Sequence, residues 1–368
     1  MKLFGRKAGR EAPRPALARG YAFGGGDWPQ SYEAQVREGY AVNPVCQRAV
    51  KLVAEGVGGA PLTASDPALV ALVDARSSGQ GLLETVAAQL LLHGNAYVQL
   101  LGDGDGGVGE LFALRPERVS IEADASGWPA AYLYRVGGQV SRLVADGPRP
   151  EIVHIKAFSP SDDHYGLGCL GAAAGAIAIH NAATKWNKAL LDNAARPSGA
   201  LVYDPGDGST MSAEQFARLR NEMEAGFAGA VNAGRPMLLE GGLKWQAMSL
   251  SPADMDFVGL KAAAAREIAL AFGVPPMLLG LPGDAAYANY REANRALWRL
   301  QILPLAEAIL TALAQGLRGW FDQPSLRVDL DRVGALSEDR ERLWRSVSRA
   351  DFLDASEKRA LLGLGEAA

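Results

Sequence analysis

The chain has 368 residues and a mass of 38.8 kDa, and its 37 Lys and Arg against 41 Asp and Glu give a formal net charge of −4. That balance excludes a protein that grips nucleic acid tightly by neutralising phosphates, because such proteins present a strongly basic surface. Apolar residues at 48% and charged residues at 21% are typical of a globular chain, and two cysteines are too few for a disulfide framework or a four-thiolate zinc site.

The first segment, residues 1–29, is basic, with six Lys or Arg against one Glu over its first twenty positions. No apolar stretch follows, so we expect a disordered arm and not a secretory signal. Contact of this arm with nucleic acid or a partner is the alternative. The most apolar windows, such as 82–92 and 169–179, are too short or too rich in Gly and Ala to predict a bilayer span of about 20 residues, and we expect no membrane association.

Three helices and a set of short strands are predicted next. Asn43-Pro44 is typical of an N-cap followed by proline at the first helical position, Asp66-Pro67 repeats this signal, and residues 82–93 predict a third helix. Short runs rich in Val, Leu, Ile and Tyr follow between Gly and Pro turns, at 95–101, 109–114, 119–123, 131–136 and 151–155. This order predicts an α+β fold with a small, mostly antiparallel β-layer.

Helix dominates the second half of the chain. Residues 168–195 contain no proline and predict a helix about 40 Å long. Further helices are expected at 253–272, ending at Gly273, and at 289–316, with a kink at Pro304; residues 337–362 are charged but helical in pattern.

Between the first two long helices lies an insert. Strands are expected at 200–203, 236–240 and 244–250, and Ser212 with Gln215 predicts a capping box for a helix. We expect a small core in this insert. The apolar stripe of the helix supplies Phe216, Met223 and Phe227, and the strand at 244–250 supplies Trp245.

Motifs of catalysis are absent. The sequence has no phosphate-binding loop, no pair of histidines at zinc-helix spacing and no nucleophile elbow. Asp162-Asp163-His164 suggests a metal or acid–base cluster, but a capping turn is the favoured interpretation. The glycine-rich run 102–107 similarly favours a hairpin turn over a calcium loop. We therefore expect no enzyme: no catalytic residue, no cofactor and no metal.

Six stretches, in order along the chain, carry a family resemblance. They are LLLHGNAYVQLL at 90–101, ELFALRPERVSI at 110–121, EIVHIKAFSPSDDHYGLGCL at 151–170, NAARPSGALV at 193–202, EIALAFGVPPMLLGL at 267–281 and YANYREANRALWRLQILPLAEAIL at 287–310. In this order and spacing they resemble the portal proteins of tailed double-stranded DNA phages, in particular the Hong Kong 97-type family. The small size and Ala-rich composition resemble the short portals of gene transfer agents or prophages.

The resemblance implies a portal fold whose parts coincide with the predicted segments. After the arm at 1–29 these parts are a wing at 30–168, a first stem helix at 169–195, an α/β clip at 196–252, a second stem helix at 253–274, a tunnel loop at 275–288, a kinked wing helix at 289–316 and a short helical crown at 317–368. Two long helices on either side of an insert are typical of a helical hairpin, the stem, with a small module at its tip. In a single chain this stem would stay half exposed, and packing between neighbouring copies in a ring would bury it.

The resemblance also implies a role as head-to-tail connector. Twelve copies would form a ring at one capsid vertex, through which a separate terminase packages DNA that is later ejected. The implied partners are the other copies, double-stranded DNA in transit, the major capsid protein, the terminase large subunit and a head-completion or adaptor protein. The implied location is a virion or phage-like particle, assembled in the bacterial cytoplasm. Twelve copies at −4 carry a formal charge of −48, and such a weak or repulsive field suits a sliding polymer.

Three groups of site residues follow from this architecture. Those expected to approach DNA from the tunnel loop are Leu281, Asp284, Tyr287 and Asn289, with packing of Leu281 and Tyr287 against the next subunit as an equal alternative. On the stem, Lys185 and Lys188 either contact phosphates or, as we favour, pair with Asp254 or Asp256 of a neighbour. On the clip, Arg218, Arg220 and Glu222 are expected to contact the adaptor or the terminase.

Two other functions remain open from the sequence. One is an oligomeric scaffold or adaptor without DNA passage. The other is a DNA-processing enzyme, which needs clustered acidic metal ligands that Asp162 and Asp163 alone do not supply.

Overall fold

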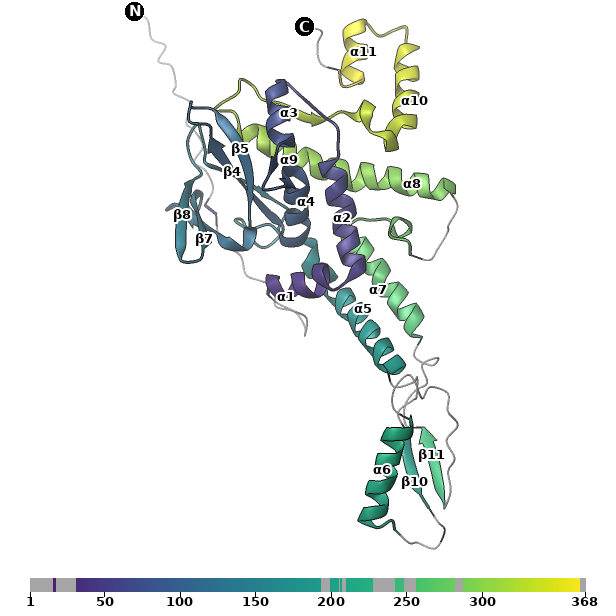
Figure 1. The fold of residues 1–368 in the computed structure, drawn as a ribbon. Coiled ribbons are helices and arrows are strands. Elements are labelled where there is room, and N and C mark those ends of the chain that lie inside the picture. Colours follow the sequence, from purple (N-terminus) through teal and green to yellow (C-terminus); the bar gives the residue numbers. More distant parts are fainter. Residues whose placement is uncertain are drawn as a thin grey trace, which may run out of the picture.

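The computed structural model of the chain describes residues 16–17, 31–192, 199–204, 206, 210–227, 242–247, 256–281 and 287–364. Figure 1 shows a body of helices and small sheets, a pair of helices that leaves it, and a small module at the far end of that pair. Helices and antiparallel sheets occupy separate parts of the body, which confirms the predicted α+β class.

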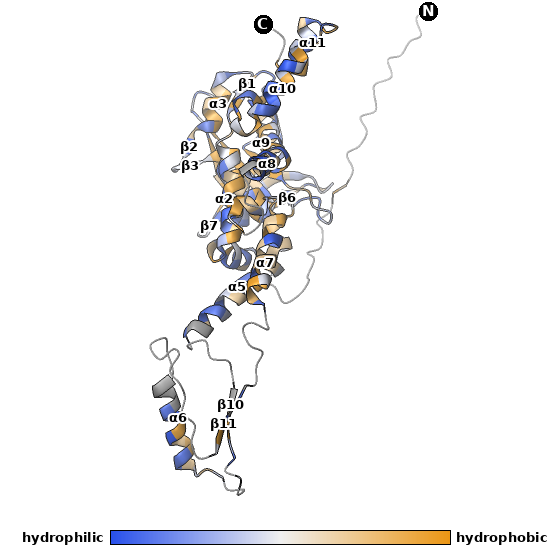
Figure 2. Ribbon diagram, turned by 90° about the vertical axis from the view of Figure 1, so that its right-hand side faces the viewer, coloured by the Kyte–Doolittle hydropathy of each residue, from blue (hydrophilic) through white to orange (hydrophobic). Residues whose placement is uncertain are grey.

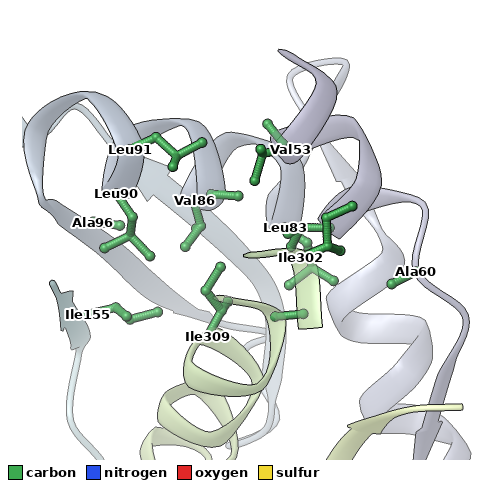
Figure 3. Packing of buried hydrophobic residues seen from close by; sticks show 14 of the residues in the cluster. Val53, Ala60, Leu83, Val86, Leu90, Leu91, Ala96, Ile155, Ile302 and Ile309 are labelled. Atoms are coloured by element: carbon green, nitrogen blue, oxygen red, sulfur yellow. The ribbon is translucent and has the colours of Figure 1, made fainter. Parts of the chain in front are cut away.

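Helices α2 (Pro44–Gly58), α3 (Pro67–Asp74) and α4 (Leu82–His93) form one side of the body. The predicted caps are present: the Asn43 carboxamide accepts from the backbone N–H groups of Val45 and Cys46, and the Asp66 carboxylate accepts from that of Ala68. The main core lies between α2, α4 and the later helix α9 (Leu303–Gly316). Figure 3 shows part of it, with Val53, Leu83, Val86, Leu90 and Ile309 pointing toward one another.

Two three-stranded antiparallel sheets cover the other side of the body. The first has the order β5-β4-β9 and the second the order β6-β7-β8. Their strands are β4 (Asn95–Gly102), β5 (Val108–Leu114), β6 (Val119–Ala123), β7 (Pro129–Val136), β8 (Gln139–Val144) and β9 (Ile152–Lys156). The sequence predicted five of these six within a few residues. It missed β8, whose side chains are mostly exposed and which therefore lacks an apolar run.

A second, smaller core joins the two sheets. Its aromatic centre is Tyr97, which stacks on His154 with ring centroids 4.4 Å apart and meets Tyr132 edge-on. His154 Nε2 bonds to Asn95 Oδ1 at 3.0 Å, and its Nδ1 bonds to the Tyr132 hydroxyl at 3.2 Å. Burial and nearby Lys156 lower the pKa of His154 to about 3, so this histidine is neutral in the folded chain.

The C-terminal part of the chain returns to the body before it ends in two helices. Strand β12 (Leu326–Val328) pairs antiparallel with β1 (Leu62–Ala64), and Val333 and Leu336 are buried in the main core. Helices α10 (Ser337–Ser348) and α11 (Ala355–Leu361) lie beyond them, near the C-terminus in Figure 1. The shorter elements are β2 (Arg76–Ser77), β3 (Gln80–Gly81) and the 3-10 turns η2 (Pro116–Arg118), η6 (Leu330–Arg332) and η7 (Gly334–Leu336).

The helix predicted at 289–316 is present, but it is not a regular α-helix throughout. Helix α8 (Tyr287–Leu297) continues into a π-helical segment, η5 (Trp298–Ile302), and then into α9. Proline lacks an N–H and leaves the carbonyl four residues before it without its helical partner. The wider turns of η5, immediately before Leu303 and Pro304, are therefore the irregularity that the proline causes.

Near the N-terminus, Ser31 caps a short helix, α1 (Tyr32–Val36), which runs into a π-helical segment, η1 (Arg37–Ala41). Most of the predicted arm lies outside the described residues. Within it, the backbone N–H of Leu17 donates to the carbonyl of Ser126 in the turn between β6 and β7.

Candidate functional site

The predicted stem is a pair of packed helices, α5 (Cys169–Asp192) and α7 (Phe257–Ala271). Their buried faces carry small residues, which let the two backbones approach closely. These are Ala173, Ala176 and Ala183 on α5 and Ala264, Ala265 and Ala269 on α7. The indole of Trp186 stacks on the ring of Phe257 with centroids 4.2 Å apart. In Figure 2, α5 changes from orange toward blue as it approaches the terminal module, so this helix becomes more polar with distance from the body.

A polar cluster fastens α5 to the body. The Asn43 amide donates to Asn181 Oδ1 at 2.9 Å and lies 3.2 Å from His180 Nδ1, while Asn181 donates to the carbonyl of Glu38. The Asn43 side chain, which also caps α2, is fully buried. Burial and nearby Lys261 lower the pKa of His180, which is therefore neutral near pH 7.

The predicted stem residues lie in different local environments. Lys185 is exposed, and Lys188 pairs with Asp192 one turn further along α5, with Nζ and Oδ2 2.6 Å apart. Asp256 is the N-cap of α7 and accepts from the backbone N–H of Gly259. Asp254 lies outside the described residues. The described helix begins at Phe257 and not at 253 as predicted, because Asp256 has a φ of 38°, in the left-handed region.

The predicted tunnel loop, residues 275–288, is described at its beginning and at its end. It begins with the 3-10 turn η4 (Pro276–Leu279), which ends at Gly280, with Leu281 half-buried, and its last residues already belong to α8, which begins at Tyr287 and packs against η4. Asn289 is exposed in the first turn of α8. Asp284 and the side chain of Tyr287 lie outside the described residues, so the contacts expected for these four residues stay predictions.

The module at the far end of the stem contains α6 (Ala213–Phe227) and the antiparallel pair β10 (Gly199–Tyr203) and β11 (Leu243–Ala247). The predicted capping box is confirmed: Ser212 N–H donates to Gln215 Oε1, and Gln215 N–H donates to Ser212 Oγ. Arg218 and Glu222, both predicted to contact a partner, pair with each other at 3.2 Å, and Arg220 is exposed beside them.

The expected core of this module is only partly in place. Phe216 is 62% exposed, so its assignment to a closed core is wrong for the single chain. A hollow of about 480 Å³ lies beside it, lined by Leu201, Tyr203, Met211, Leu219 and Leu243 among others. The side chains of Met223, Phe227 and Trp245 lie outside the described residues, as does the strand predicted at 236–240.

Two apolar surfaces on the stem were not predicted from the sequence. The α7 face consists of Leu260, Ala263, Glu267 and Leu270, which lie on one side of α7 and are all exposed, Leu270 to 79%. The α5 groove is a hollow of about 290 Å³ between α5 and η1, lined by Arg37, Glu38, Leu170, Ile177, Ala182 and Lys185 among others. These surfaces are hard to predict from the Ala-rich sequences of the two helices, because large apolar residues are few and widely spaced in both.

The sequence clusters that suggested chemistry have structural roles. One oxygen of Asp162 accepts from the backbone N–H groups of His164 and Tyr165, and His164 Nε2 bonds to the carbonyl of Gly127. Asp103 likewise accepts from the N–H groups of Asp105 and Gly107 and closes the hairpin between β4 and β5. Among the described residues no three or more His, Cys, Asp or Glu side chains are placed to hold a metal ion.

One described helical stretch, residues 289–316, is long and apolar enough to cross a bilayer by length and composition alone. A core helix passes the same test. Its C-terminal half, α9, buries Ala306, Ile309, Leu310 and Leu313 in the main core, and 33% of the apolar window is buried in all.

Sequence comparison relates most of the chain to one family. The family described as "Phage portal protein" matches residues 44–363. A Rickettsia felis protein described as uncharacterized is 39% identical over 349 residues, which span 89% of this chain and 88% of that protein. The "Probable portal protein" of Streptomyces phage phiC31 is 29% identical over 245 residues, which span 64% of this chain and 52% of that protein.

Solved structures extend the similarity to the fold. A chain in the "Neck of native GTA particle computed with C12 symmetry" is 50% identical, with a TM-score of 0.71, and the match covers 93% of this chain and 96% of that one. A phage portal protein of the HK97 family from Corynebacterium diphtheriae shares the fold at 18% identity, with a TM-score of 0.60, over 83% of this chain and 96% of its own.

Proposed function

The chain belongs to the phage portal protein family, and on that basis we propose that it forms the ring at one vertex of a phage-like particle that connects the head to the neck and lets double-stranded DNA pass. The observation that carries this proposal is the match to the neck of a gene transfer agent particle over nearly the whole of both chains. At 50% identity it also favours a gene transfer agent over a long-tailed phage as the particle.

The twelve-fold symmetry of that neck supports a ring of twelve subunits. A closed ring needs two different surfaces on each subunit, each complementary to the other. The α7 face and the α5 groove meet this requirement. The first projects Leu260 and Leu270 around Glu267, and the second is a hollow with Leu170 and Ile177 in its wall, whose lining also carries Lys185 and the Arg37–Glu38 pair. Seating the α7 face of one subunit in the α5 groove of the next covers apolar surface and brings Glu267 toward Lys185.

The remaining partners follow from the role of a connector. The module with α6, β10 and β11 forms the distal tip of the stem, where an adaptor or the terminase would bind, and Arg220 and the Arg218–Glu222 pair are exposed there. The capsid protein would surround the ring. In this proposal the chain is a conduit without catalytic activity, and a separate terminase supplies the force that moves DNA.

Electron microscopy of the purified protein tests the proposal. We expect rings of about twelve subunits with an axial hole wide enough for duplex DNA, which is about 20 Å across. Particles assembled without the protein should then contain no DNA. A closed disc, a linear filament or normal DNA content without the protein would overturn the proposal and favour a scaffold that does not conduct DNA.

A further inference from the structure

The buried carboxamide of Asn43 is held in one orientation. Its Oδ1 accepts from the backbone N–H groups of Val45 and Cys46, at 3.1 and 3.0 Å, and so caps α2. Its Nδ2 donates to Asn181 Oδ1 at 2.9 Å and faces His180 Nδ1 at 3.2 Å. Because the cap requires the oxygen on the α2 side, the end of the amide that meets α5 is the NH₂ group and can only donate.

This orientation fixes the protonation state of His180. Its Nδ1 has to accept from the Asn43 amide, so the ring is neutral and carries its proton on Nε2. The side chain is only 5% exposed, and burial together with the positive charge of Lys261 on α7 lowers its pKa. The neighbouring acid on η1, Glu38, directs its carboxylate to Arg37, with Oε1 and Nε 3.6 Å apart.

Protonation of His180 would bring two donors face to face. The new hydrogen on Nδ1 would point at Asn43 Nδ2, which lies 3.2 Å away. Turning the Asn43 amide over would remove this conflict, but it would break both cap bonds to α2 and place donors against the backbone N–H groups there. The conflict is relieved instead when α5 moves away from α2, or when His180 leaves its buried position.

The same contacts set the shape of the α5 groove. Asn181, which Asn43 holds from α2, donates to the carbonyl of Glu38 at 2.8 Å, and both Asn181 and Glu38 line the groove. Nearby, η1 approaches α5 so closely at Gly39 that a Cβ there would lie 2.7 Å from Leu170 Cδ1. A movement of α5 at this stem junction, where it meets α2 and η1, would therefore change the spacing of the groove walls.

We propose that Asn43 and His180 position α5 for the contact between subunits, so that rings form while His180 is neutral and dissociate when it is protonated. This inference rests on the proposed function, because the α5 groove is one side of that contact. Both residues act through the stem junction. Since a freely exposed histidine titrates near pH 6.5, lowering the pH to 5 should favour the open junction by up to about 30-fold in each subunit.

The diagnostic variant is His180→Gln. A glutamine side-chain oxygen can accept from the Asn43 amide, as the imidazole does, and it does not titrate. The matched control is His154→Gln, which replaces another buried neutral histidine, one that bonds to Asn95 and Tyr132 between the sheets of the body. Other acid-sensitive groups of the contact, such as Glu267, are the same in all three proteins.

Sedimentation velocity at pH 7.5 and pH 5.0 tests the inference, with circular dichroism as the check that the chains stay folded. All three proteins should form rings at pH 7.5. At pH 5.0 the wild type and His154→Gln should be largely single chains with their helical signal retained, whereas His180→Gln should still sediment as rings. Wild-type rings that persist at pH 5.0 would overturn the inference, as would His180→Gln rings that dissociate like those of the wild type.

Hydrogen exchange of residues 177–186 gives a readout that does not require rings. The exchange rate of the wild type relative to that of His180→Gln should rise at least about fivefold between pH 7.5 and pH 5.0. An unchanged ratio would overturn the inference. A wild-type chain that forms no rings even at pH 7.5 would instead refute the proposed function, and the exchange ratio would still decide whether His180 controls the stem junction.

Discussion

Trp186 of α5 and Phe257 of α7 stack with their ring planes 24° apart, at the end of the helix pair that is farthest from the body. Along the described helices, most other contacts between α5 and α7 are made by alanines and a few aliphatic side chains, each of which contributes little area. This aromatic pair therefore helps to hold the two helices together as they leave the body, and hence to place the distal module.

Replacing Trp186 with Ala should lower the free energy of unfolding by about 1–2 kcal/mol, because it removes both the stack and the area that it buries. Trp186→Phe keeps an aromatic ring and should lose less than half of that amount. Urea unfolding followed by circular dichroism measures both values. Equal losses in the two variants would show that the stack itself contributes little.

Stability should fall as the pH falls below about 6.5. His154, with a folded pKa of about 3, and His93 and His180, whose pKa values are also lowered by burial, are neutral in the folded chain and protonate in the unfolded one. The unfolded state then binds more protons, so their contribution is complete above the unfolded pKa and is lost below it. His154 alone should cost about 2 kcal/mol between pH 7 and pH 5.

The comparison to make is between the wild type and His154→Gln, unfolded in urea at pH 7 and at pH 5. The variant is less stable at pH 7 because it loses the stack on Tyr97, but its further loss at pH 5 should be smaller by about 2 kcal/mol. If the wild type and the variant lose the same free energy of unfolding between pH 7 and pH 5, the acid sensitivity comes from groups other than His154.

Gly94→Ala should be among the most damaging single changes in the body. Gly94 has a φ of 82° at the junction of α4 and β4, and a Cβ there would lie within 3.0 Å of the backbone of Leu167 and Gly168. Gly79, with a φ of 77° and open space around it, is the control. We expect a loss of at least about 3 kcal/mol for Gly94→Ala and about 1 kcal/mol for Gly79→Ala in thermal unfolding. Similar losses of stability in the two variants would mean that the backbone of Leu167 and Gly168, in the loop before α5, shifts at little cost to make room for the new methyl group.

Leu270→Glu should leave the single chain folded, since the side chain is 79% exposed, but should abolish ring formation by placing a charge in the contact between subunits. Val140→Glu on β8, 57% exposed and far from the stem, should still assemble. Sedimentation velocity separates rings from single chains. Rings that form normally with Leu270→Glu would remove the α7 face from the proposed contact.

Deleting residues 280–286 should leave rings intact and reduce the filling of particles with DNA. A short linker can replace the deleted residues, and the packing of η4 against α8 keeps the flanking elements together. Particles are counted as filled or empty by electron microscopy. Filling at the wild-type level would remove the loop from DNA transit.

Local signals explain what the sequence alone could predict. Asn43-Pro44, Asp66-Pro67 and Ser212 with Gln215 place helix starts correctly because a cap satisfies backbone groups within three residues of itself. Five of the six strands of the two sheets are also predictable, since each carries a run of Val, Leu, Ile or Tyr between turns, whereas β8 lacks such a run.

Features that depend on distant residues escaped prediction. The pairing of β1 with β12, the exposure of Phe216 and the contacts of Arg295 with α10 are each decided by a partner far along the chain or by a surface that the single chain leaves uncovered. The residues around Arg295 in the sequence do not distinguish it from an arginine that faces solvent. Only the position of α10 does so.

The pairing of β1 with β12 also bears on how the chain is made. Leu62 lies opposite Val328, so β1 has to wait for 266 further residues before its partner leaves the ribosome. At synthesis rates of about 5–20 residues per second, that delay is about 10–50 s. During this time β1 presents an unpaired edge beside a half-built core, and chains on neighbouring ribosomes carry the same edge. Slow synthesis therefore prolongs the exposure of this edge, and a chaperone that covers β1 until β12 emerges would lower the chance that nascent chains pair with one another.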